Sequence, residues 1–119
     1  EVGPFVDLIE EADGLVFGSP TINGDAVKPV WDLLSSLTAV SVRGKLGGAF
    51  GSYGWTGEAV GMIEDRLRGL KLRVPVKGVR ARLIPSALEL EECRTFGRNL
   101  AGQLAGTHDK QIIDMAALA

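Results

Sequence analysis

Two short, continuously apolar runs, each ending in small residues, place the strongest constraint on how this chain folds. They are Leu15–Ser19 and Leu46–Gly51, and each is followed by a loop and then by a segment with helical periodicity. Apolar runs of this length suit strands that are buried on both faces, as in a parallel sheet. Because strand, loop and helix alternate twice, the sequence predicts a doubly wound, three-layer α/β/α fold.

Apolar residues at a period of 3.6 identify the helical segments. A short helix is predicted within residues 1–12, and a longer one begins near Asp25. A third extends from Glu58 to Arg68, and Thr56 is its expected N-cap. The apolar stripe of the helix that begins near Asp25 places its tryptophan in the core and consists of Val27, Val30, Trp31, Leu34 and Leu37.

The segment after the third helix predicts an interrupted strand. Residues 70–76 and 79–84 favour β-structure but are separated by Pro75 and Gly78, which is typical of an edge strand with a break. Five cations lie along this segment, either as a solvated edge protected against pairing or as a docking patch for an acidic electron-transfer partner: Lys71, Arg73, Lys77, Arg80 and Arg82.

The last predicted helix begins at a capping box. Ser86 and Glu89 have the required spacing, and Cys93 lies on the apolar stripe that follows, where we expect it to fill the core. No element is assigned to the end of the chain. We therefore divide the sequence into a partial domain, residues 1–106, and a C-terminal tail, residues 107–119.

Composition excludes several classes of protein. The 119 residues include one cysteine and one histidine, so an internal disulfide and a structural zinc or iron–sulfur centre are excluded. The formal net charge of −2 argues against a nucleic-acid surface, and no apolar run approaches the length of a membrane span. We expect a soluble cytoplasmic protein with no nucleic-acid or membrane partner.

Two unusual loops follow the two predicted strands. They are Ser19–Gly24 and Ser52–Gly57, here called the first and second loops. Ligands of open α/β sheets bind at the carboxyl ends of the strands, where both loops lie. Tyr53 and Trp55 offer flat apolar faces for a planar heteroaromatic ring. The alternative is that they are ordinary loop aromatics among turn-forming glycines. No catalytic acid, base or nucleophile and no metal ligand is assigned.

At these loops the sequence resembles a known family. Gly18–Asn23, followed by a helix near Asp25, and Ala49–Trp55, followed by a Gly-bearing helix start, resemble the flavodoxin-like domain of flavodiiron proteins, or A-type flavoproteins. The resemblance extends from about Phe5 to Leu104. It implies that the loops flank the isoalloxazine ring of noncovalently bound FMN, through Ser19, Pro20, Thr21, Ile22, Asn23, Gly24, Ser52, Tyr53, Gly54, Trp55, Thr56 and Gly57.

The same resemblance implies electron transfer and its partners. In that family the flavin carries electrons from a rubredoxin or rubredoxin reductase-type donor to a diiron site in a β-lactamase-like domain, where oxygen or nitric oxide is reduced. Two alternatives stay open. One is a flavin-free flavodoxin-like binding or assembly module, and the other is a fragment of a flavin-dependent quinone reductase.

The sequence departs from the family at its N-terminus. Flavodoxin-like domains open with a strand, a Ser/Thr-rich phosphate loop, a helix and a second strand, whereas this sequence begins at the helix before the third strand. We therefore expect a truncated domain without the phosphate anchor. Without its neighbour, the strand at Leu15–Ser19 becomes a bare apolar edge, so we expect the chain to form homo-oligomers through it.

Overall fold

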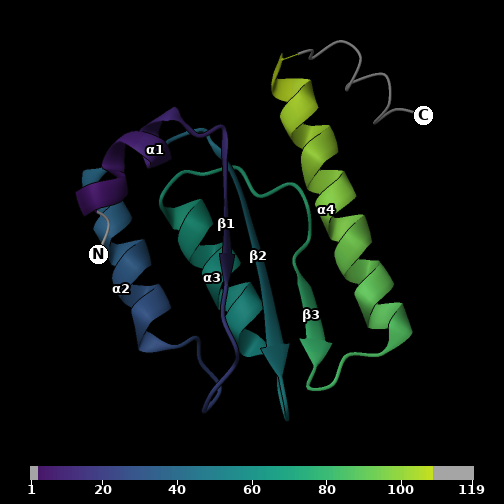
Figure 1. Cartoon of the computed structure of the whole chain (residues 1–119). Coiled ribbons are helices and arrows are strands. Elements are labelled where there is room, and N and C mark those ends of the chain that lie inside the picture. The colour runs from purple at the N-terminus through teal and green to yellow at the C-terminus, as the bar shows by residue number, and fades with distance from the viewer. Residues whose placement is uncertain (1–2, 109–119) are drawn as a thin grey trace.

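The computed structural model describes residues 3–108 and contains a three-stranded parallel sheet in the order β1-β2-β3 (Figure 1). The strands are β1 (Gly14–Gly18), β2 (Leu46–Tyr53) and β3 (Val79–Arg82). The predicted parallel α/β sheet is therefore confirmed. In the described part of the chain, β1 lies at one edge, with Val16 exposed on it, whereas association through that edge stays a prediction.

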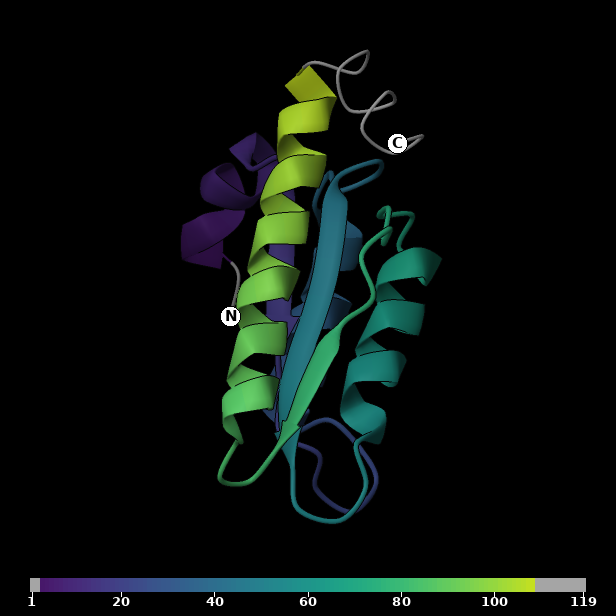
Figure 2. The same cartoon turned by 90° about the vertical axis from the view of Figure 1, so that its right-hand side faces the viewer.

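Helices cover both faces of this sheet, as Figure 2 shows for α3 and α4 on opposite sides. The helices are α1 (Val6–Glu11), α2 (Lys28–Ser36), α3 (Glu58–Gly69) and α4 (Ala87–His108). Two 3-10 turns, Gly3–Phe5 and Leu37–Ala39, precede α1 and follow α2. The α2 helix begins three residues later than predicted. Asp25 is held instead in a tight backbone turn with Ile22, which delays helical geometry.

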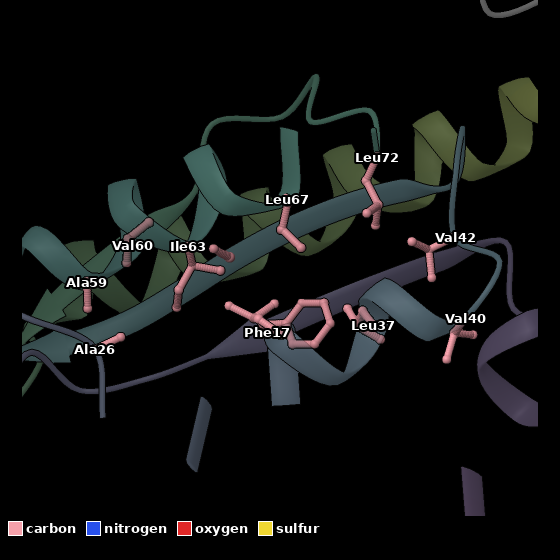
Figure 3. Close-up of a cluster of buried hydrophobic side chains, with 12 residues drawn as sticks. Phe17, Ala26, Leu37, Val40, Val42, Ala59, Val60, Ile63, Leu67 and Leu72 are labelled. Carbon is pink, nitrogen blue, oxygen red and sulfur yellow. The ribbon is translucent and has the colours of Figure 1, made fainter. Parts of the chain in front are cut away.

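Most of the buried apolar side chains lie on the face covered by α2 and α3 (Figure 3). Phe17 and Ala49 from the strands pack there against Leu34, Ile63 and Leu67 from the helices. On the other face, a smaller cluster joins Leu46 of β2 to Phe96 and Leu100 of α4. Trp31 packs against the larger cluster and is partly buried, in agreement with its predicted place in the core.

The predicted edge strand is interrupted as expected. Arg73 forms an isolated parallel bridge with Leu46, and β3 resumes pairing with β2 six residues later. Between these points the backbone N–H of Gly78 donates to the carboxylate of Glu64 at 2.7 Å. Glu64 is buried on α3, so this helix holds the break in place through an otherwise unpaired backbone donor.

The capping box at the start of α4 is confirmed, but the burial of Cys93 is not. Ser86 N–H donates to Glu89 Oε1 at 2.9 Å, and Glu89 N–H donates to Ser86 Oγ at 3.1 Å. Cys93 is exposed, so its prediction as a core residue was wrong. Helical spacing places Cys93 on the same stripe as Phe96 and Leu100, but burial also requires a neighbour that covers the side chain. Phe96 and Leu100 belong to the buried cluster between α4 and the sheet, whereas Cys93 does not.

The capping box makes stability depend on pH. The pKa of Glu89 is lowered, first by the hydrogen bond from Ser86 N–H and then by that from Arg82 N–H. A carboxyl with a lowered folded-state pKa stabilises above its unfolded pKa of about 4.3, and this stabilisation is lost as pH falls through the folded value. Glu89→Gln is therefore expected to lower the Tm at pH 7 and to approach the parent Tm below pH 4.

Thermal unfolding across pH 3–7 tests this prediction. Glu92→Gln removes the same charge from an exposed position of the same helix and is the matched control. A Tm difference between Glu89→Gln and the parent chain that stays constant from pH 7 to pH 3, or that Glu92→Gln reproduces, would contradict the role given to the cap.

Candidate functional site

The first and second loops meet at the carboxyl ends of β1 and β2, the edge of the sheet at the bottom of Figure 1. A cavity of about 280 Å³ lies between them, close to the smallest volumes found for small-molecule sites. Each loop supplies three of its lining residues, which are Thr21, Asn23, Gly24, Gly54, Trp55 and Thr56. Six of the twelve residues predicted for the site are therefore brought together around one cavity.

The tip of the first loop is a type I′ turn. Ile22 N–H donates to Asp25 O at 2.8 Å, and Asp25 N–H donates to Ile22 O at 3.1 Å. The two central residues have positive φ, 54° at Asn23 and 74° at Gly24, which an Asn-Gly pair adopts with little strain. Asp25 Oδ1 accepts from Trp31 Nε1 at 2.8 Å, so the turn is tied to α2.

Ser19 holds the first loop in place from beneath. Its side chain is buried, and its Oγ donates to Pro20 O at 2.7 Å and accepts from Val27 N–H at 3.1 Å. Val27 is the N-cap residue of α2, so the serine links the end of β1 to the helix start. Ser19, Pro20 and Ile22 do not line the cavity.

Thr21 connects the two loops. Its N–H donates to Ser52 O at 2.9 Å, and its Oγ1 accepts from Ala59 N–H at 3.1 Å in the first turn of α3. The prediction that Thr56 caps α3 was wrong, because Gly57 is the N-cap residue and has no side chain that could accept a hydrogen bond. The free donor of α3 is satisfied by a threonine 38 positions earlier in the chain.

The second loop is shorter than predicted, because β2 continues through Ser52 and Tyr53. Tyr53 lies outside the cavity, beside the guanidinium carbons of Arg80 and Arg82, which are 5.7 and 5.8 Å from its ring centroid. Gly57 is buried at the start of α3 and also lies outside the cavity lining. Trp55, by contrast, is 95% exposed at the cavity.

Two acidic residues near the loops were not predicted for the site. Asp25 supports the first turn, and Glu58 begins α3 beside Thr56. A side-chain hydrogen bond from Thr56 and then the backbone N–H of Glu58 itself lower the pKa of Glu58, with a further contribution from Arg80. An acidic residue in the first turn of a predicted helix was the signal available in the sequence.

The cross-loop cap is expected to contribute measurably to stability. Thr21→Val removes the hydroxyl that accepts from Ala59 N–H, so we expect the free energy of unfolding to fall by about 1 kcal/mol, the usual cost of losing a helix cap. Thr21→Ser keeps the hydroxyl and should restore most of the loss. Urea unfolding followed by circular dichroism measures the difference.

Thr38→Val is the matched control for this substitution. Its hydroxyl donates to Ser35 O on the exposed surface and caps no helix start, so its loss should change the free energy of unfolding by less than about 0.5 kcal/mol. An equal effect of the two substitutions would show that the contact between Thr21 and α3 contributes nothing specific.

Two general features of the described residues bear on the kind of site. Within residues 3–108, histidine, cysteine and carboxylate side chains do not gather in groups of three or more able to hold a metal ion. Over the same range, no helix combines the length and the apolar character needed to cross a membrane. The cavity itself is lined by glycine backbone, short polar side chains and one aromatic ring.

Comparison of the sequence with protein families and curated proteins identifies relatives of this chain. The flavodoxin family model matches residues 2–97. The type A flavoprotein fprA of Rhodobacter capsulatus is 57% identical over 119 residues, which are 100% of this chain and 27% of that protein. The chain thus spans about a quarter of the length of this curated relative.

Solved structures show the same fold. The flavodiiron core of Flv1 from Synechocystis superposes with a TM-score of 0.80 at 30% identity, over 90% of this chain and 27% of that one. The rubredoxin oxygen:oxidoreductase of Desulfovibrio gigas gives a TM-score of 0.75 at 29% identity, over 80% of this chain and 24% of that one. The fold is therefore that of a flavodoxin-like domain.

Proposed function

The chain belongs to the flavodoxin family, and from this premise we propose that it is an FMN-binding electron-transfer domain. The observation that carries the proposal is the cavity between the first and second loops, with the exposed Trp55 ring at its wall. Similarity to flavodiiron proteins supports a place in a flavodiiron-type oxidoreductase. Electrons would then pass from a rubredoxin or rubredoxin reductase-type donor to a diiron site that reduces oxygen or nitric oxide.

The residues at the cavity suit a planar heteroaromatic ring. A Cβ on Gly24 would have Glu58 Oε2 as its nearest neighbour, at 3.8 Å, and a Cβ on Gly54 would have Leu83 Cδ1, at 3.9 Å. The space beside both glycines is therefore open, so a ring can approach the backbone at both positions. The N–H groups of Asn23, Gly24 and Trp55 have no intramolecular partner in the described part of the chain. Free donors on both loops fit the carbonyl and nitrogen acceptors along the edge of an isoalloxazine ring.

In this proposal the chain binds the flavin ring, orients it and shields it from solvent. The Trp55 side chain stacks on the ring, and the backbone N–H groups of Asn23, Gly24 and Trp55 donate to its edge. Thr21 keeps the two loops at a fixed separation. FMN supplies the electron-transfer chemistry that protein side chains lack. Because three lining residues come from each loop, a shift of either loop changes the width of the cavity.

A protein donor also fits the surface beside the cavity. The loop between β3 and α4 exposes Leu83 and Ile84 at the same edge of the sheet, and Leu83 lies 3.9 Å from the Cβ position of Gly54. Arg80 and Arg82 flank this apolar surface. An apolar centre with basic neighbours suits a small acidic electron-transfer protein, which is the docking alternative that the sequence left open.

Reconstitution with FMN tests the proposed function. The purified chain is titrated with FMN while the visible spectrum and the quenching of flavin fluorescence are recorded. We expect saturable quenching and a shifted flavin band, because a stacked aromatic ring quenches the excited flavin. Unquenched fluorescence at high micromolar FMN would reject the proposal and favour a flavin-free binding module with the same fold.

A further inference from the structure

One carboxylate at the cavity has no part in the proposed binding of the ring. Glu58 is the first residue of α3, and its Oε2 lies 3.8 Å from the position of a Cβ on Gly24. Its side chain also hydrogen-bonds to Thr56. Gly24 of the first loop and Thr56 of the second both line the cavity, so the carboxylate lies at its rim between the two loops.

The charge at this position is negative at neutral pH. The hydrogen bond from Thr56, the backbone N–H of Glu58 and then Arg80 lower the pKa of the carboxyl. Within residues 3–108, no cation lies within 4.0 Å of it. The Arg80 guanidinium donates instead to Gly57 O at 3.1 Å, and the second acid near the loops, Asp25, is engaged by Trp31 and by the N–H of Ala26.

A fixed carboxylate affects the two oxidation states of a flavin unequally. Two electrons and one proton, delivered by a reduced redox protein, convert oxidised FMN into a reduced form whose ring carries one more negative charge. Repulsion from a nearby carboxylate disfavours this added charge and has little effect on the neutral oxidised ring. The carboxylate therefore weakens binding of reduced FMN more than binding of oxidised FMN.

We propose that Glu58 lowers the reduction potential of FMN bound between the two loops and so favours release of its electrons to the acceptor. This inference rests on the proposed function, because it requires FMN at the cavity. Glu58 acts only through the negative charge that it places near the flavin, and it neither transfers a proton nor forms a bond in the reaction.

Glu58→Gln tests the proposal by comparing the two oxidation states. The dissociation constants of oxidised FMN and of dithionite-reduced FMN are measured for the parent chain and the variant. We expect the ratio of the reduced to the oxidised constant to fall about tenfold in Glu58→Gln, which corresponds to a potential about 30 mV higher for a two-electron couple. Potentiometric titration of the FMN complex should give the same shift.

Two variants separate charge from structure. Glu58→Asp keeps the carboxylate and should keep the parent ratio. If Glu58 only stabilised the start of α3, Glu58→Gln would change the Tm without changing the ratio. Glu11→Gln removes the same charge from an exposed position at the end of α1 and should leave the ratio unchanged. Glu11 lies before the amino end of β1, whereas the two loops follow the carboxyl ends of the strands.

The outcomes distinguish this inference from the proposed function. If the parent chain binds FMN and Glu58→Gln leaves both the ratio and the potential unchanged, the role of Glu58 is rejected while the proposed function stands. An equal shift in Glu11→Gln would also reject it, because the effect would then come from net charge. If the parent chain binds neither form of FMN, both proposals are rejected.

Discussion

Trp55→Ala is expected to weaken FMN binding about tenfold or more and to leave the free energy of unfolding nearly unchanged. The indole is 95% exposed, so its removal creates no cavity in the core. It lines the ring cavity, and stacking of an aromatic side chain on a heteroaromatic ring contributes about 1–3 kcal/mol. Fluorescence titration gives the affinity, and urea unfolding gives the stability.

Ile84→Ala is the matched control, because Ile84 is 92% exposed at the same edge of the sheet but does not line the cavity. Riboflavin serves as a second probe. If the chain contacts the flavin ring but not the phosphate, riboflavin should bind about as well as FMN. Trp55→Ala should then lower the affinity for both ligands equally. Unchanged affinity of Trp55→Ala for either ligand would contradict the stacking role.

Gly51→Ala is expected to produce the largest loss of stability, roughly 3 kcal/mol. A Cβ at this position would collide with the backbone carbonyl oxygen of Ser19 and lie 3.2 Å from Cγ2 of Val60. Backbone gives way less easily than a flexible side chain, so the end of β1 must move away from β2. That movement also separates Thr21 N–H from Ser52 O, which opens the site.

Gly61→Ala makes the same chemical change where there is room for it. Gly61 is exposed in the middle of α3, and its Cβ position has nothing within 4 Å, so alanine should stabilise the helix by about 0.5–1 kcal/mol. Opposite signs for the two alanine substitutions in urea unfolding are the expected result. A Gly51→Ala chain as stable as its parent would show that β1 and β2 do not require this close approach.

Local patterns in the sequence predicted much of this fold correctly. The apolar runs that form β1 and β2, the Pro75 and Gly78 that interrupt the edge strand, and the Ser86–Glu89 cap are each patterns of residues that are close in sequence. The Asn23-Gly24 pair likewise has the positive φ that its composition favours. The pattern is local in each case, whereas the pairing of β1 with β2 and the hydrogen bond from Gly78 N–H to Glu64 join residues that are far apart in the chain.

Predictions that depended on distant neighbours were less successful. Cys93 fits the helical stripe of α4 but is exposed, because no described side chain covers it. Thr56 stands where an N-cap is expected, yet the hydroxyl that caps α3 belongs to Thr21. Tyr53 follows the same loop motif as Trp55 but belongs to β2 and lies against two arginines.

The sequence by itself determined the order of the elements, the two loops and their common edge of the sheet, because apolar spacing and turn composition act over a few residues. The tertiary structure alone decided which loop residues share a cavity, which hydroxyl caps α3 and where the Glu58 carboxylate lies. These outcomes require segments more than thirty positions apart to meet within hydrogen-bonding or van der Waals distance. Packing of the whole chain sets such distances, and no local spacing encodes them.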